Sequence, residues 1–221
     1  MKKRQIVGHT AILMLSIFAF HKFACAADGD WQIWSTAGVQ GKVYLGWTVK
    51  LEEQFRFGNQ AADIYYHHVQ TDLVYQIRSW MALGLTYRHI YMKVAGIWQQ
   101  EKRPTLGVAL STSRSIYRLE MSQKLERHIR DWSDNGWSYR NKLSVTLEKS
   151  WTQFDVKPYL ADEIFVNLKG GGVYRNRLFA GVKSRLFDKI YPDLFFLWQS
   201  TESPVSWTDF YVLGGNLNFR F

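Results

Sequence analysis

Long segments of this chain alternate between apolar and polar side chains. In the first such segment the apolar members are Val43, Leu45, Trp47, Val49 and Leu51. The residues that alternate with them include Gly46, Thr48, Lys50 and Glu52. Successive side chains of a strand point to opposite faces, so a period of two predicts strands with one apolar and one charged face.

Turn residues divide the chain into segments of this kind. The segments are 43–57, 63–77, 80–93, 98–112, 115–130, 137–149, 153–168, 173–187, 190–201 and 207–221. A soluble sandwich shows the same alternation, but its strands are usually only about 5 or 6 residues long. The length therefore predicts an all-β fold: a transmembrane, up-and-down antiparallel β-barrel of about 10 strands, or about 12 if two have been merged.

Residues 31–39 do not fit an even-numbered barrel. We expect them to lie in the lumen or the periplasm, or to extend the first strand. Short joints at 78–79, 113–114 and 188–189 alternate with longer ones at 130–136 and 169–172. This asymmetry predicts tight turns at the periplasmic end and longer loops at the outer end.

Aromatic residues make up 16% of the chain, and many lie near the ends of the segments. Tyr and Trp favour the lipid–water interface, so the pattern predicts two aromatic girdles. Near the longer loops these are Tyr65, Tyr66, Tyr91, Trp98, Trp132, Trp137, Tyr174 and Trp207; near the short turns they are Trp80, Trp151 and Tyr191.

The last segment has one alternating face that ends at the C-terminus. Its members are Tyr211, Leu213, Gly215, Leu217, Phe219 and Phe221. This ending resembles the recognition strand by which the outer-membrane assembly machinery takes in its substrates. The expected partners are therefore outer-membrane lipid and the barrel-assembly machinery, the latter through the strand ending at Phe221.

The N-terminus has the features of a cleavable signal peptide. Three basic residues follow Met1, an apolar run extends from Ile6 to Phe20, and Ala24-Cys25-Ala26 offers a cleavage site. The run is shorter than the roughly 20 residues of a membrane-spanning helix. We expect residues 1–26 to be removed on export and residues 27–221 to form one barrel domain in the outer membrane.

The formal charge of +9 decreases on this processing. Four of the 28 basic residues leave with the signal peptide, so 24 remain against 19 acidic ones, a charge of +5. The remaining basic residues are spread evenly along the chain, which argues against a nucleic-acid partner. Cys25 also leaves, so the mature protein is expected to form no disulfide.

Several longer runs resemble a known family. They include EEQFRFG, DIYYHHVQTDLVYQI, YRLEMSQKLERHIR, KPYLADEIFVN and RNRLFAGV. With their dispersed Glu, Arg, Tyr and Pro positions, they are similar to the bacterial outer-membrane family catalogued as domain of unknown function 2490, from about Trp31 to Phe221. The resemblance implies a barrel in the cell envelope and brings no activity with it.

The polar face of the segments supplies candidates for the wall of the lumen. They are Lys50, Glu52, Arg56, Asp72, Arg88, Glu101, Arg103, Arg118, Glu120, Lys124, Glu126, Arg140, Lys142, Glu148, Glu163, Arg177, Lys183 and Arg185. Basic residues outnumber acidic ones there. One interpretation is a plug of paired charges that holds the barrel rigid. The other is a narrow pore that prefers small anions.

No motif joins catalytic or metal-binding residues. His67, His68, His89 and His128 and several serines are present, but their spacing does not connect them. No cysteine survives processing, and the run at 169–172 lacks the Lys-Ser/Thr ending of a phosphate loop. We expect no catalytic residue, cofactor or metal. The alternatives are an outer-membrane hydrolase of lipid or peptide, and a soluble periplasmic β-barrel that binds a ligand.

Overall fold

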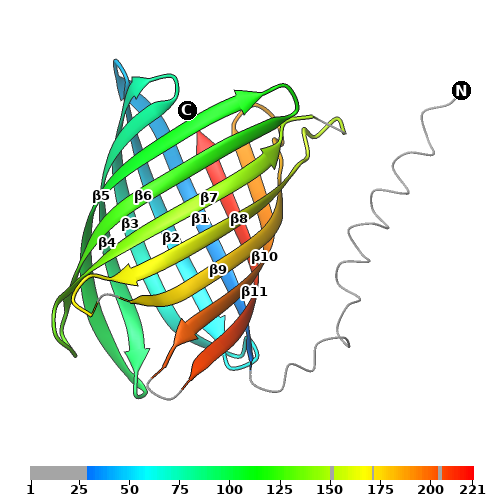
Figure 1. The fold of residues 1–221 in the computed structure, drawn as a ribbon. Coiled ribbons are helices and arrows are strands. Elements are labelled where there is room, and N and C mark those ends of the chain that lie inside the picture. The colour runs from blue at the N-terminus through cyan, green and yellow to red at the C-terminus, as the bar shows by residue number, and fades with distance from the viewer. Residues whose placement is uncertain (1–28, 150–151, 171, 204–205) are drawn as a thin grey trace, which may run out of the picture.

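The chain forms a closed β-barrel (Figure 1). The computed structural model describes residues 29–149, 152–170, 172–203 and 206–221, and these ranges hold eleven strands. The strands are β1 (Asp30–Tyr44), β2 (Trp47–Gly58), β3 (Asp63–Arg78), β4 (Met81–Val94), β5 (Ile97–Arg114), β6 (Tyr117–Arg130), β7 (Gly136–Leu147), β8 (Lys157–Asn167), β9 (Val173–Lys183), β10 (Ile190–Glu202) and β11 (Trp207–Arg220). The predicted all-β barrel is confirmed.

Each strand pairs in antiparallel fashion with its neighbours in sequence, except where the barrel closes. There β1 and β11 run parallel, with Ala37 opposite Leu217, and Figure 1 shows the two strands side by side. The expected even number of strands and fully antiparallel order are therefore wrong for the described residues. An odd number of strands requires one parallel pair, because the first and last strands then point in the same direction.

The additional strand is β1, which contains the segment at 31–39. It is a full wall strand, paired with β2 on one side and β11 on the other. The predicted segment at 43–57 merges the end of β1, a two-residue turn and β2. Alternation runs through this turn without a break, and Gly46 adopts a positive φ of 77° there. A turn this tight leaves too weak a signal in the sequence to separate two strands.

The connections differ less between the two ends than expected. The end that carries Phe221, here called the C-terminal rim, has two-residue turns at 45–46, 79–80 and 115–116 but longer connections at 148–156 and 184–189. The opposite rim has loops at 59–62, 131–135 and 168–172 but a two-residue turn at 95–96. The predicted asymmetry therefore holds for only part of each rim.

The two faces of the wall differ in polarity. Exposed apolar side chains cover the outside, among them Ile33, Leu51, Val69, Leu85, Leu106, Leu143, Leu160, Leu178, Leu194 and Leu213. The buried polar side chains include Gln54, His68, Gln70, Asp72, Arg88, Glu101, Glu126, His128, Glu163, Arg177 and Gln199. This is the reverse of a soluble protein and is typical of barrels that span a bilayer.

The lumen is not polar throughout. A cluster of Trp34, Tyr159, Ala161, Phe179, Phe195, Leu197 and Val212 is buried inside the wall formed by β8–β11 and β1. Some aromatic residues expected in the girdles also point inward: Tyr66 is buried, and Tyr65 and Tyr174 line an internal cavity. These rings pack with charged lumen side chains rather than lie at an interface.

No helix in the described ranges is long and apolar enough to cross a membrane. The predicted signal peptide at 1–26 and the girdle residue Trp151 lie outside the described residues.

Candidate functional site

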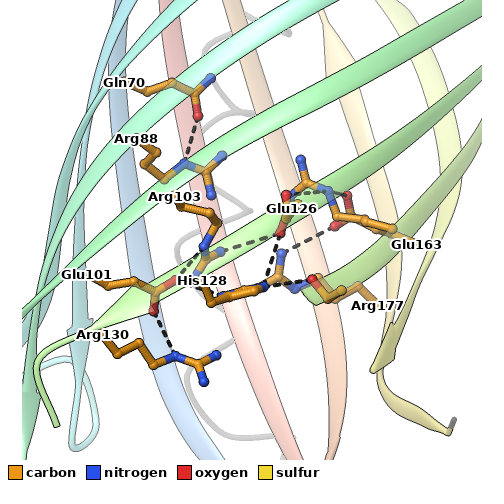
Figure 2. Close-up of polar contacts among 11 residues, drawn as sticks. Gln70, Arg88, Glu101, Arg103, Glu126, His128, Arg130, Glu163 and Arg177 are labelled. Atoms are coloured by element: carbon orange, nitrogen blue, oxygen red, sulfur yellow. Dashed lines mark hydrogen bonds and ion pairs between the residues drawn. The ribbon is translucent and has the colours of Figure 1, made fainter. Parts of the chain in front are cut away.

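A row of alternating basic and acidic side chains runs along the inner wall (Figure 2). In order of contact its members are Arg130, Glu101, Arg103, Glu126, Arg140, Glu163 and Arg177, here called the lumen ion-pair chain. Strands β5 to β9 supply these residues, and each occupies an inward position of its strand's alternation.

Each glutamate of the lumen ion-pair chain lies between two arginines. Arg103 Nε is 2.7 Å from Glu101 Oε1, and Arg177 Nη1 is 3.2 Å from Glu163 Oε2. The other contacts in the chain measure 3.3–3.7 Å. A buried carboxylate is tolerated only when it is paired, and each of these is paired twice. The chain therefore fixes its members in place and cancels most of their charge.

Three further lumen arginines have neutral partners. Arg56 donates from Nε to Gln54 at 2.6 Å, Arg88 donates to Gln70 at 2.7 Å, and Arg175 donates to Thr201 at 3.2 Å. None of the three forms an ion pair with a carboxylate in the described part of the chain. Their positive charges are therefore held in position without being cancelled.

Aromatic rings support several of these guanidinium groups. The Cζ of Arg56 lies 3.7 Å from the ring centre of Trp34 and 4.1 Å from that of Tyr66. Arg175 and Arg177 lie 5.5 and 4.8 Å from the ring of Phe165. Stacking on a ring orients a guanidinium and leaves its edge free to bind an anion.

These arginines face a cavity of about 880 Å³ at the rim opposite the C-terminus, here called the vestibule. Its basic lining residues are Arg56, Arg88, Lys93, Arg103, Arg130, Arg140, Arg175 and Arg177. Its acidic lining residues are Asp30, Asp63 and Glu101. The excess of basic residues gives the vestibule a positive potential, which low-dielectric walls strengthen.

A second cavity, of about 300 Å³, lies deeper in the lumen. It shares four residues with the vestibule: Arg56, Arg88, Arg140 and Arg177. These four arginines come from β2, β4, β7 and β9, and we call them the arginine waist. They lie where the two cavities adjoin.

Two more cavities, of about 330 Å³ each, continue toward the C-terminal rim. One shares Ser122 and Lys142 with the second cavity, and the other shares Asp193 and Asn218 with it. The lumen thus holds a series of adjoining spaces from one rim to the other, and the arginine waist is one of their boundaries.

His128 links a carboxylate to a hydroxyl beside the vestibule. Its Nδ1 lies 2.8 Å from Glu101 Oε1, and its Nε2 lies 2.7 Å from Ser138 Oγ. The order hydroxyl, imidazole, carboxylate is that of a serine hydrolase. Nothing in the spacing of these residues connects them, because they come from β5, β6 and β7 and meet only when the strands pair.

The adjacent histidines His67 and His68 lie on opposite faces of β3. His68 points inward, with Nε2 at 3.6 Å from Glu52. His67 points outward and stacks on Phe55, with ring centres 4.5 Å apart. Across the described ranges, no three His, Cys, Asp or Glu side chains are close enough together to hold a metal ion.

The structure distributes the predicted lumen residues over several levels. Arg103, Glu126, Arg140, Glu163 and Arg177 belong to the lumen ion-pair chain with Glu101, and Arg56 and Arg88 complete the arginine waist. Lys50, Glu52, Lys124 and Lys142 line the second cavity. Arg118, Glu120 and Lys183 lie toward the C-terminal rim. Arg185 lines the same cavity as these three but is exposed in the connection after β9, because that strand ends at Lys183 rather than near 187.

Sequence reasoning missed Arg130, Arg175 and Ser138. A signal for the first two was present, since Arg130 continues the phase of Glu126 and Arg175 that of Arg177. Trp34 and Phe165 were also missed as supports for arginines. No sequence signal identifies Ser138, whose role depends on its neighbours.

Comparison with solved structures supports the fold. The chain is similar to the NanC porin, with a TM-score of 0.51 and 9% identity, covering 87% of this chain and 99% of that one. It is also similar to an anion-selective porin from Comamonas acidovorans, with a TM-score of 0.40 and 10% identity, covering 80% of this chain and 53% of that one. At these identities the first likeness shows the barrel fold alone, and the second carries no argument.

A search of curated proteins finds no match. The family model described as "Protein of unknown function (DUF2490)" matches residues 31–209, which is most of the chain. This match confirms the resemblance seen in the sequence. The chain belongs to the DUF2490 family.

Proposed function

We propose that this protein is an outer-membrane barrel that forms a narrow, anion-preferring pore and performs no catalysis. The arginine waist is the observation that carries the proposal. Two of its members, Arg56 and Arg88, have only neutral partners, and it separates the vestibule from the deeper lumen. Uncancelled positive charge on the wall of a narrow lumen attracts anions and repels cations.

Conductance in planar bilayers tests the pore. Purified, refolded protein is expected to give small currents, with a reversal potential in a potassium chloride gradient that favours chloride. Changing both Arg56→Gln and Arg88→Gln removes the uncancelled waist charge and should move the permeability ratio toward one. The matched control is Arg127→Gln, which removes the same charge from a residue stacked on Trp137 on the outer wall. Silent bilayers would favour the rigid plug instead.

The outer-membrane location rests on the apolar outer wall and the porin-like fold. The expected result is recovery in the outer-membrane fraction, with gel mobility that shifts on heating. Recovery in periplasmic extract without detergent would favour a soluble ligand-binding barrel. Recognition by the assembly machinery through β11 and Phe221 stays a prediction.

A hydrolase is the second candidate, and the contact of His128 with Ser138 and Glu101 favours it. Two observations oppose it. Ser138 is only 3% exposed and is not among the residues that line the vestibule. The inward face of a paired strand also offers no free backbone N–H groups to stabilise an oxyanion, because the ladder uses them.

A labelling experiment separates the two candidates. An activated serine would react with a fluorophosphonate probe, and Ser138→Ala would abolish the reaction. We expect no labelling of the folded barrel and no change in ester hydrolysis between the native chain and Ser138→Ala. Labelling that depends on both Ser138 and His128 would favour the hydrolase over the pore as the function of this protein.

A further inference from the structure

We propose that the vestibule binds a small organic polyanion with at least two acidic groups. The inference deepens the proposed pore and rests on it for its physiological meaning, but it concerns binding and can be tested without conduction. Its geometric basis is the set of Arg56, Arg88 and Arg175, here called the free arginines, all of which line the vestibule.

The free arginines differ from the other vestibule arginines in what holds them. Arg103, Arg130, Arg140 and Arg177 contact glutamates, whereas the free arginines each donate from Nε to a neutral oxygen. In the described ranges none of the three pairs with a carboxylate; Arg56 has a further contact with the neutral hydroxyl of Tyr65. A guanidinium has five N–H donors, so each keeps donors available to a ligand or to water.

The free arginines are also held in position before any ligand arrives. Gln54, Gln70 and Thr201 fix one edge of each guanidinium. Trp34 and Tyr66 stack on Arg56, and Phe165 and Tyr174 lie beside Arg175. An arrangement fixed in advance loses little conformational entropy on binding, which favours affinity. Neutral hydrogen-bond partners and aromatic rings hold the three guanidiniums in place without neutralising their positive charge.

The distribution of these charges points to more than one acidic group on the ligand. Arg56 and Arg88 come from β2 and β4, whereas Arg175 comes from β9, and β1, β11 and β10 separate β9 from β2 around the barrel. A single small monoanion balances only one of these three charges. A ligand with two or three carboxylates or phosphates can contact both sides and relieve the repulsion between the arginines.

The remaining lining suits an organic body between the acidic groups. The vestibule volume of about 880 Å³ lies within the usual range for small-molecule pockets. Tyr65, Tyr66, Phe165, Tyr174 and Phe210 contribute rings to its wall. An inorganic ion would leave most of this space and these rings unused.

Calorimetry on the folded barrel in detergent tests the inference with three probes. Benzene-1,3,5-tricarboxylate carries three acids on a ring, benzoate carries one, and inorganic pyrophosphate is a polyanion without an organic body. The tricarboxylate should bind at least tenfold more tightly than either of the others. Equal affinity for benzoate would contradict the inference that the ligand carries at least two acidic groups. Equal or tighter binding of pyrophosphate would contradict the inference that the ligand has an organic body.

Variants outside the arginine waist keep binding and conduction distinguishable. Arg175→Gln should weaken tricarboxylate binding at least tenfold, and Arg175→Lys, which keeps the charge but loses the planar fork, should weaken it less. Arg127→Gln on the outer wall is the control and should leave the affinity unchanged. Tight binding of the tricarboxylate together with electrically silent bilayers would contradict the pore proposal but support the binding site. Anion-selective currents together with equal affinities for the three probes would contradict the binding site but support the pore proposal.

Discussion

Gly214 of β11 lies on the inner face directly opposite Phe195 of β10. A Cβ atom at this position would overlap the ring of Phe195, which belongs to the buried cluster on this side of the lumen. The absence of a side chain therefore lets the ring lie across the neighbouring strand. Gly215, the next residue, points outward, and a Cβ there would meet Leu194 at an ordinary 3.5 Å.

We therefore expect Gly214→Ala to destabilise the barrel by about 1–3 kcal/mol, because the Phe195 ring must move within a packed interior. Gly215→Ala is the matched control, and it should be neutral or slightly stabilising because alanine restricts the unfolded chain. The measurement is the urea concentration at which the heat-modifiable gel band is lost. Equal effects of the two substitutions would show that Phe195 does not occupy the place assigned to it.

At the scale of strands, the lumen ion-pair chain joins five neighbouring elements across their inner faces. Glu163 of β8 contacts Arg140 of β7 at 3.5 Å and Arg177 of β9 at 3.2 Å. It is buried, so its charge and those of its partners depend on one another. By contrast, Glu148 near the C-terminal rim pairs with Lys157 at 2.9 Å while both remain partly exposed.

Glu163→Gln should lower the free energy of unfolding by about 3–5 kcal/mol, because it leaves two buried guanidiniums with less compensation. Glu148→Gln should cost no more than about 1 kcal/mol, since the exposed pair is screened by solvent. If the variant still inserts into bilayers, Glu163→Gln should also increase the preference for chloride. An unchanged urea midpoint together with an unchanged permeability ratio would contradict the role of Glu163.

At the scale of the whole molecule, the parallel pair of β1 and β11 closes the barrel. It brings Ala37 opposite Leu217, and both side chains face outward. Because the two strands run in the same direction, Asp30 and Phe221 lie at opposite rims. A barrel of ten strands without β1 would close differently and would not place Ala37 opposite Leu217.

Paired cysteines test this closure. In a Cys25→Ser background, Ala37→Cys with Leu217→Cys should form a disulfide on mild oxidation, because opposed residues of neighbouring strands lie within disulfide range. The measurement is gel mobility with and without reductant. Ala37→Cys with Val145→Cys, an outward residue of β7, is the control and should not cross-link. A folded barrel that fails to link Ala37 to Leu217 would show that β1 is not the closing strand.

The faces of the strands could be predicted because alternation is local. Within β11, Leu213 and Leu217 occupy one set of alternate positions, and Val212 and Gly214 occupy the other. The structure places these two sets on opposite faces. The inward arginines follow from the same rule. The strand boundaries were predicted less well where the alternation passes through a tight turn, as at Gly46, or where a strand ends early, as at Lys183.

By itself, the sequence determined an all-β barrel with an apolar outer wall and a basic polar interior, because side-chain direction in a strand depends only on position along it. Only the tertiary structure decided the eleven-strand closure, the pairing of His128 with Glu101, 27 residues away, and the separation of free arginines from paired ones. These features depend on register between strands. Register is fixed by contacts between distant segments, and no single segment records it.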